Sequence, residues 1–125
     1  SHMSLYDPFS QHDLSEDKNS IVINCLIHML SEKSIHTDDF KRFIKNEAIG
    51  GDVDWGIEKW DIYSDQDHGI KDKFDGYLFF IGPDEHGDLD RGELQVILTK
   101  DQIKPYISNI IDWYKNIPMM RFRRD

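Results

Sequence analysis

The first half of the chain begins with apolar residues at helical spacing. Between residues 21 and 30 they recur every three or four positions, which places them on one side of a helix, and Ser15 or Asp17 can act as its N-cap. We therefore predict a first helix that runs to about Lys33. Its buried side is expected to contain Ile21, Val22, Cys25, Leu26, Met29 and Leu30.

A second helix is predicted to begin at Thr37, because this residue can cap a helix and two acids follow it at the positive end of the helix dipole. Gly50-Gly51 is expected to end this helix, since glycine tolerates the left-handed conformation. The loop between the two helices is short, so they are expected to pair as an antiparallel hairpin. The buried stripe of the second helix is predicted to be Phe40, Phe43 and Ile44.

The period of the pattern changes to two after residue 52. Apolar residues alternate over 53–57 and again over 60–62, and we interpret the break between them as a β-bulge. The segment 76–82, "GYLFFIG", is apolar on both faces, which is typical of a central strand. In 93–100, "ELQVILTK", alternation predicts that the face carrying Leu98 is the better buried one. Polar turns separate these segments, so the pattern predicts a three-stranded antiparallel meander.

A last helix is predicted over about 102–117, with Pro118 as its end. Thr99 and Gln102 have the spacing of a capping box, whereas Pro105 favours a start nearer Asp101, because proline is easily accommodated only in a first turn. The spacing leaves this boundary open. The buried stripe of the helix is predicted to be Ile103, Tyr106, Ile107, Ile110, Ile111, Tyr114 and Ile117.

These elements predict one α+β domain. It has two N-terminal helices, a three-stranded antiparallel meander and a C-terminal helix packed on the sheet. We interpret residues 1–3 as an expression scar, 4–118 as the domain and 119–125 as a basic C-terminal tail. No apolar segment has the length of a membrane span, and a single cysteine cannot form an internal disulfide, which favours a soluble cytoplasmic protein. Cys25 falls on the buried side of a helix, so we expect a structural thiol.

The charge of the chain is concentrated in its middle. The net charge is −9 overall, and residues 50–90 carry 12 acidic and 3 basic side chains, which by itself amounts to −9. Nucleic acid and anionic membranes are unexpected partners, because such a surface repels phosphate. A basic protein or another cation would be attracted.

The segment 83–93, "PDEHGDLDRGE", tests whether these acids hold a metal ion. A calcium loop that started at Asp84 would require glycine where Leu89 stands and glutamate where Gln95 stands, so the register fails. His68 and His86 flank the 76–82 strand and are expected at its opposite ends, both solvated, which argues against zinc. No motif predicts a cofactor, a metal or a catalytic residue, and wet carboxylates are poor general acids.

Two interpretations of the acids remain. They keep a short sheet soluble, or together with exposed aromatics they form a docking surface for a basic partner. Trp55 and Tyr77 are expected in the core, whereas Trp60 and Tyr63 are candidate anchors. The acids at 84–90 are expected at the other end of the sheet, so the 52–75 set is favoured. All candidate contacts are Asp52, Asp54, Trp60, Asp61, Tyr63, Asp65, Asp67, Asp72, Asp84, Glu85, Asp88 and Asp90.

The whole pattern resembles the small acidic immunity proteins of contact-dependent growth inhibition and related polymorphic toxin systems. The resemblance covers the chain from "FSQHDLSEDKNSIVINCLIHML" to "DGYLFFIGPDEHGDLDRGELQVILTKDQIKPYI". It implies a non-enzymatic inhibitor that binds a cognate basic toxin domain, often a nuclease, and blocks its active site or an essential surface. The alternatives are a non-inhibitory acidic interaction or regulatory module, which could be a homodimer, and an acid-dependent enzyme.

Overall fold

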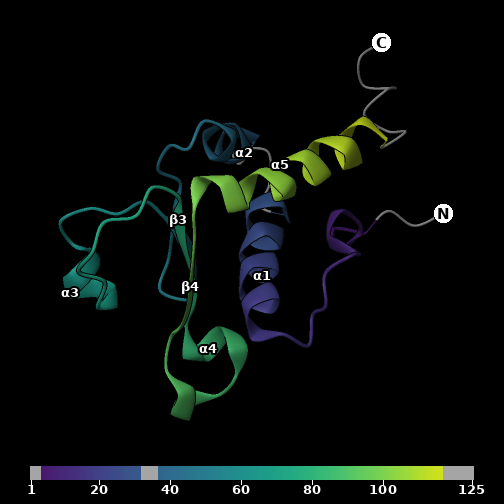
Figure 1. Cartoon of the computed structure of the whole chain (residues 1–125). Coiled ribbons are helices and arrows are strands. Elements are labelled where there is room, and N and C mark those ends of the chain that lie inside the picture. The colour runs from purple at the N-terminus through teal and green to yellow at the C-terminus, as the bar shows by residue number, and fades with distance from the viewer. Residues whose placement is uncertain (1–3, 32–36, 117–125) are drawn as a thin grey trace.

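Within the described residues, 4–31 and 37–116, a four-stranded antiparallel sheet lies between helix α1 (Asp17–Ser31) and the short helix α3 (Ser64–His68) (Figure 1). The structure is a computed structural model of the whole chain. It confirms the mixed α+β class. The other elements are η1 (Asp7–Phe9), α2 (Thr37–Ile44), β1 (Gly50–Gly51), β2 (Trp55–Glu58), β3 (Tyr77–Ile81), α4 (Pro83–His86), η3 (Leu89–Arg91), β4 (Leu94–Leu98) and α5 (Lys100–Lys115).

The two faces of the sheet carry different side chains. The strands lie in the order β1-β2-β3-β4, and each is antiparallel to its neighbour. The register pairs Trp55 with Ile81 and Tyr77 with Leu98, and these side chains belong to the core on the side of α1. Strand β3 has neighbours on both sides and is buried on both faces, as its apolar sequence predicted. We call the side away from α1 the outer face.

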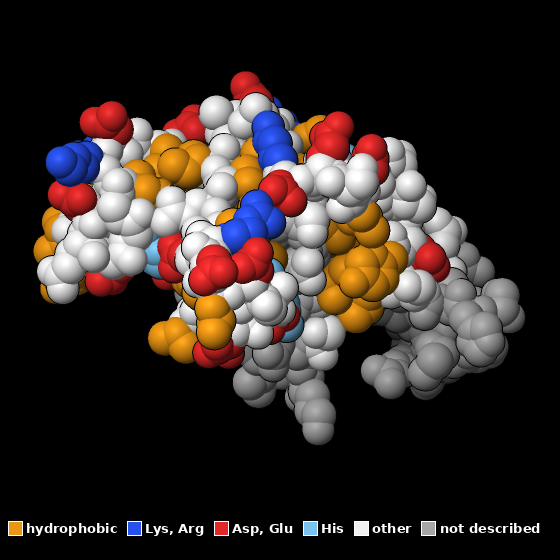
Figure 2. Space-filling view, turned by 90° about the horizontal axis from the view of Figure 1, so that it is seen from below, with side chains coloured by type: hydrophobic (Ala, Val, Ile, Leu, Met, Phe, Trp, Pro, Cys, Tyr) orange, Lys and Arg blue, Asp and Glu red, His pale blue; other side chains and the backbone are white. Residues whose placement is uncertain are grey.

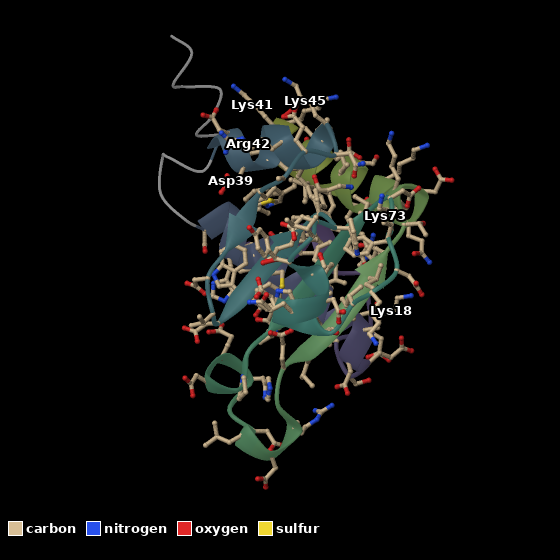
Figure 3. The ribbon with its side chains drawn as sticks, turned by 90° about the vertical axis from the view of Figure 1, so that its left-hand side faces the viewer. Lys18, Asp39, Lys41, Arg42, Lys45 and Lys73 are labelled. Carbon is tan, nitrogen blue, oxygen red and sulfur yellow. The ribbon has the colours of Figure 1, made fainter. Side chains whose placement is uncertain are left out.

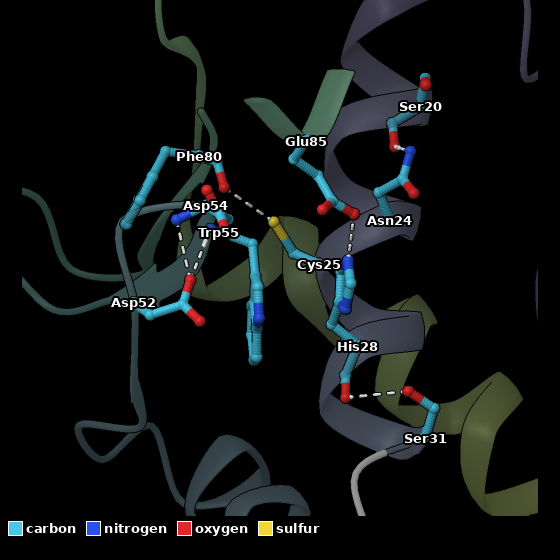
Figure 4. Close-up of polar contacts among 10 residues, drawn as sticks. All are labelled: Ser20, Asn24, Cys25, His28, Ser31, Asp52, Asp54, Trp55, Phe80 and Glu85. Atoms are coloured by element: carbon cyan, nitrogen blue, oxygen red, sulfur yellow. Dashed lines mark hydrogen bonds and ion pairs between the residues drawn. The ribbon is translucent and has the colours of Figure 1, made fainter. Parts of the chain in front are cut away.

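Helix α1 closes the inner face with most of the side chains that its periodicity predicted, although Leu30 is only half-buried and Ile23, which was not predicted, is buried. Leu26 and Met29 are fully buried, and so is Cys25. The Cys25 thiol donates a hydrogen bond to the carbonyl oxygen of Phe80 at 3.3 Å (Figure 4). Burial raises the pKa of this thiol to about 12, so the prediction of a structural thiol is confirmed.

The outer face depends on a close contact between β2 and β3. Gly56 lies opposite Phe80, and the Phe80 ring covers its Cα. A β-carbon at Gly56 would lie 2.1 Å from a ring carbon of Phe80, so only glycine fits beneath the ring. Phe80 is thereby buried, with an exposed fraction of 3%, although it points away from the main core.

Helix α5 begins with a complete capping box. The Thr99 hydroxyl accepts from the backbone N–H of Gln102 at 3.2 Å, and the Gln102 side chain accepts from the Thr99 N–H at 2.9 Å. The helix therefore begins at Lys100, and Pro105 lies inside it. These two hydrogen bonds fix the first residue of α5, which the spacing of Thr99, Gln102 and Pro105 had left open. Ile103, Tyr106 and Ile110 are buried in the common core, as predicted.

The prediction of three strands was wrong. Gly50 and Gly51, expected to end a helix, form β1 and pair with Ile57 and Gly56. A β-carbon at Gly51 would lie 2.4 Å from the Trp55 carbonyl oxygen, so this close approach of two backbones requires glycine. Residues 60–62, expected as strand, leave the sheet instead, because hydrogen bonds within 61–64 turn the chain into α3.

The helical predictions also need correction. The two polar turns contain α3 and α4, each ended by a left-handed glycine, Gly69 and Gly87. Helix α2 ends at Ile44, which is 44% exposed and not part of a buried stripe. The Tyr77 hydroxyl donates to the carbonyl oxygen of Glu47 at 2.6 Å and so fixes the chain after α2. The expression scar at 1–3, the tail at 119–125 and Ile117 lie outside the described residues.

Leu98→Asp is expected to unfold the domain, because Leu98 is 2% exposed and the change buries an unpaired charge. We expect a loss of at least about 3 kcal/mol in the free energy of unfolding, measured by urea denaturation. Ile97→Asp is the matched control, since Ile97 is the next residue on the opposite face and is 42% exposed. Equal losses for the two variants would contradict the assigned faces of β4.

Gly56→Ala is expected to displace the Phe80 ring and to cost about 1–3 kcal/mol of stability, as overpacked sites do. In the double variant with Phe80→Leu, the cost of the alanine should fall, because the smaller side chain leaves room for the new β-carbon. Thermal unfolding of the single and double variants measures this coupling. Additive effects would show that the ring does not occupy this position.

Candidate functional site

Two adjoining hollows lie on the outer face, between β2 and α3. The larger has a volume of about 690 Å³ and the smaller about 430 Å³, and Glu58 and Asp67 line both. We call the two hollows together the acidic groove. The larger hollow is lined by Gly51, Asp52, Val53, Glu58, Gln66, Asp67, His68, Phe80 and Glu93. The smaller is lined by Ala48, Gly50, Glu58, Lys59, Trp60, Asp61, Tyr63 and Asp67.

His68 holds α3 against the sheet and so forms one wall of the groove. Its ring lies against Phe80, with 4.5 Å between the ring centroids, and only 8% of its side chain is exposed. Nδ1 lies 2.7 Å from a carboxylate oxygen of Glu93, and Nε2 lies 3.3 Å from one of Glu58. The Gln95 amide also donates to the His68 carbonyl at 2.9 Å. Side chains of β2, β3 and β4 therefore all fix this one residue.

The expectation that His68 and His86 are solvated was wrong. The turn that carries His68 folds back over the sheet, so the side chain contacts Phe80 instead of solvent. His86 is half-buried, and its Nε2 lies 2.6 Å from the carbonyl oxygen of Gly92. Its Nδ1 accepts from the Asp88 N–H at 3.1 Å. His68 thus fastens its turn onto the sheet, whereas His86 bonds within its own turn between β3 and β4.

Glu58 is the groove carboxylate whose ionised form the surroundings destabilise. Partial burial raises the pKa of its carboxyl group, His68 opposes this rise, and the negative charges of Asp61 and Asp67 add to it. The strand register places Glu58 on the outer face beside Leu78. A positive charge placed here would stabilise the ionised carboxylate and so offset the cost of both its partial burial and the repulsion from Asp61 and Asp67.

The structure gathers only part of the favoured acidic set. Five predicted residues line the groove, namely Asp52, Trp60, Asp61, Tyr63 and Asp67. Three others from the same segment line neither hollow, and these are Asp54, Asp65 and Asp72. Trp55 and Tyr77 are buried in the core, as expected, whereas Tyr63 is 56% exposed.

Two acids of the groove accept hydrogen bonds from nearby backbone N–H groups. The Asp52 carboxylate accepts from the N–H groups of Asp54 at 2.8 Å and Trp55 at 3.2 Å (Figure 4). Asp61 accepts from the N–H of Tyr63 at 2.8 Å. These bonds hold the two chain segments that border the groove, and each leaves further acceptor capacity on the carboxylate.

The acids at 84–90 do not join the groove. Asp84, Glu85, Asp88 and Asp90 line neither hollow. Glu85 pairs with His28, whose ring stacks on Trp55 with 5.2 Å between the ring centroids (Figure 4). The Asp88 side chain caps η3. Figure 2 views this end of the molecule and shows acidic side chains scattered among basic ones. The acids at 84–90 therefore stay outside the groove. The expectation that they lie at the other end of the sheet was wrong for Asp52 and Asp54, because Trp55 pairs with Ile81 and the Gly82 N–H donates to the Asp54 carbonyl oxygen at 2.8 Å.

Two groove acids were missed by the sequence analysis, Glu58 and Glu93. Glu58 lies in the break after the predicted strand 53–57 and Glu93 begins the predicted strand 93–100, whereas most of the candidate acids lie in predicted turns. The alternation of side chains along β2 and β4 could have placed both acids on one face of the sheet. Glu58 lies two residues from Gly56, and Glu93 lies two residues from Gln95. Gly56 and Gln95 both face the outer side.

Nearby lysines do not neutralise the groove. Lys59 directs its ammonium group to the carbonyl oxygens of Asp75 and Gly76, at 2.7 and 2.5 Å. Lys73 lies 5.2 Å from the centroid of the Trp60 ring. In Figure 3, which views the side of α3, the labelled basic side chains lie at the margins, with Lys41 and Lys45 on α2. No lysine or arginine of the described residues lines the larger hollow.

The described residues contain no group of three or more His, Cys, Asp or Glu side chains arranged to hold a metal ion. None of the helices in this part of the chain has both the length and the apolar character needed to cross a membrane. Comparison with models of known protein families, with curated proteins and with solved structures found no match for this chain.

Proposed function

We propose that this chain is a cytoplasmic immunity protein that binds and neutralises a cognate basic toxin domain, such as a ribonuclease or another nuclease. The observation that carries the proposal is the acidic groove. Its larger hollow is lined by carboxylates from β2, α3 and the start of β4, without a lysine or arginine among the described residues that line it. A surface of this kind is complementary to a protein that collects phosphate groups.

The mechanism is occlusion without chemistry. A nuclease gathers phosphates with lysine and arginine side chains, and carboxylates presented at matching positions compete for the same groups. The negative field also steers the toxin towards the groove, which raises association rates by about 10–1000-fold at low salt. Tyr63 and Trp60 border the groove and supply the aromatic contact area that anchors such complexes.

The proposed function is tested with the toxin domain encoded beside this chain in the native genome. Purified full-length chain, added in a one-to-one ratio, is expected to abolish the nuclease activity of that domain. Retention of full nuclease activity would contradict neutralisation. Self-association without toxin binding would instead support the alternative of a homodimeric regulatory module.

Salt should act mainly on the rate of association. Raising the ionic strength from about 0.01 M to 0.15 M shortens the screening length from about 30 Å to 8 Å. We expect the association rate constant, measured by stopped-flow fluorescence, to fall at least about tenfold, while the dissociation rate constant changes much less. An association rate that is independent of salt would show that the acids do not steer the partner.

A further inference from the structure

The carboxylates of the groove differ in how much of their hydrogen-bonding capacity is used. Glu93 is held by His68 and by the Gln95 amide, both at 2.7 Å, and Asp52 caps two backbone N–H groups. Glu58 has one longer contact, 3.3 Å to His68. No hydrogen bond or ion pair joins the Asp67 carboxylate to another side chain of the described residues. Among the carboxylates that line the groove, Glu58 and Asp67 therefore keep the most acceptor capacity for a ligand.

These two carboxylates favour an organic cation over a metal ion. They line both hollows, and the negative charge of Asp67 adds to the raised pKa of the Glu58 carboxyl group. The described residues offer no cluster of three metal-ligating side chains here. A guanidinium group presents several N–H donors in one plane and can bond two carboxylates at once.

The rim of the groove indicates that the cation belongs to a protein. Val53 and Tyr63 line the hollows and are 85% and 56% exposed, and Ile62, which lies next to Tyr63, is 78% exposed. Large apolar side chains that are exposed around a polar groove are typical of protein-binding surfaces. A small cationic metabolite would leave them uncovered.

The smaller hollow adds an aromatic wall. Trp60 lines it, and Lys73 lies 5.2 Å from the centroid of its ring. An extended segment of a protein can lie along this wall while one of its side chains carries the cation into the larger hollow.

We propose that the larger hollow receives a single arginine side chain from an extended segment of the partner, with the guanidinium between Glu58 and Asp67 and the backbone of the segment along Trp60. The inference rests on the proposed function in taking the partner to be a basic protein. It goes further by assigning the contact to one side chain, and it gives Glu58, which the sequence analysis missed, a central place.

The probe is the peptide acetyl-Gly-Leu-Arg-Leu-Gly-amide, titrated into the full-length chain and followed by ¹H–¹⁵N NMR. Its matched control carries citrulline, a neutral isostere, in place of arginine. We expect saturable shifts of the backbone signals of residues 52–68 and of the Trp60 indole signal with the arginine peptide alone. Equal shifts with citrulline, shifts spread over the whole acidic surface, or no shifts would each overturn the proposal.

Single substitutions test which carboxylates bind the arginine side chain of the peptide. Glu58→Gln and Asp67→Asn should each weaken binding of the arginine peptide at least about tenfold, the loss of one charged hydrogen bond. Asp65→Asn is the matched control, because Asp65 lies on the same helix outside both hollows, and it should change affinity by less than about twofold. Melting temperatures confirm that each variant is folded. Equal losses for Asp65→Asn and Asp67→Asn would overturn the site.

Neutralisation assays with the toxin domain distinguish a failure of the arginine site from a failure of the proposed function. If Glu58→Gln and Asp67→Asn neutralise the toxin domain as well as the unaltered chain does, the arginine site is wrong and the immunity function stands. If the groove binds the arginine peptide selectively but the chain neutralises no toxin, the site stands and the proposed function is wrong.

Discussion

Phe80 is the residue at which both faces of the sheet are tied together. Its carbonyl oxygen accepts from the Cys25 thiol of α1, its ring covers Gly56 of β2, and His68 of α3 lies against the same ring. Because β3 pairs with a strand on each side, these contacts fix α1 and α3 relative to each other through a single residue. The acidic groove exists only because α3 is held there, over a face that would otherwise be open to solvent.

The negative character of the groove depends as much on where the lysines go as on the number of acids. Lys59 is adjacent in sequence to Glu58, yet its ammonium group is bound to carbonyl oxygens of residues 75 and 76. Desolvation at that site lowers the pKa of the Lys59 ammonium group. The Lys59 ammonium group therefore stabilises a turn and does not neutralise the carboxylates on the outer face.

The pattern of the sequence predicted the site in part. Asp52, Asp67, Trp60 and Tyr63 do border one groove, because they belong to a continuous segment that runs through β2 and then folds back over the outer face as α3. Asp65 belongs to that segment too but lies outside both hollows, since neighbouring positions of a short helix point in different directions. Glu93 joins the groove from 25 residues beyond His68, a distance along the chain over which local pattern carries no information.

What the sequence alone determined is most of the buried positions of α1, β3 and α5. The helical period identified Leu26, Met29 and Ile110, and the unbroken apolar run identified β3, because burial repeats with the geometry of the local backbone. The pairing of Gly50–Gly51 with β2 and the contact of His68 with Phe80 and Glu93 were decided only by the tertiary structure. Both depend on which distant surfaces meet, and periodicity describes one segment at a time.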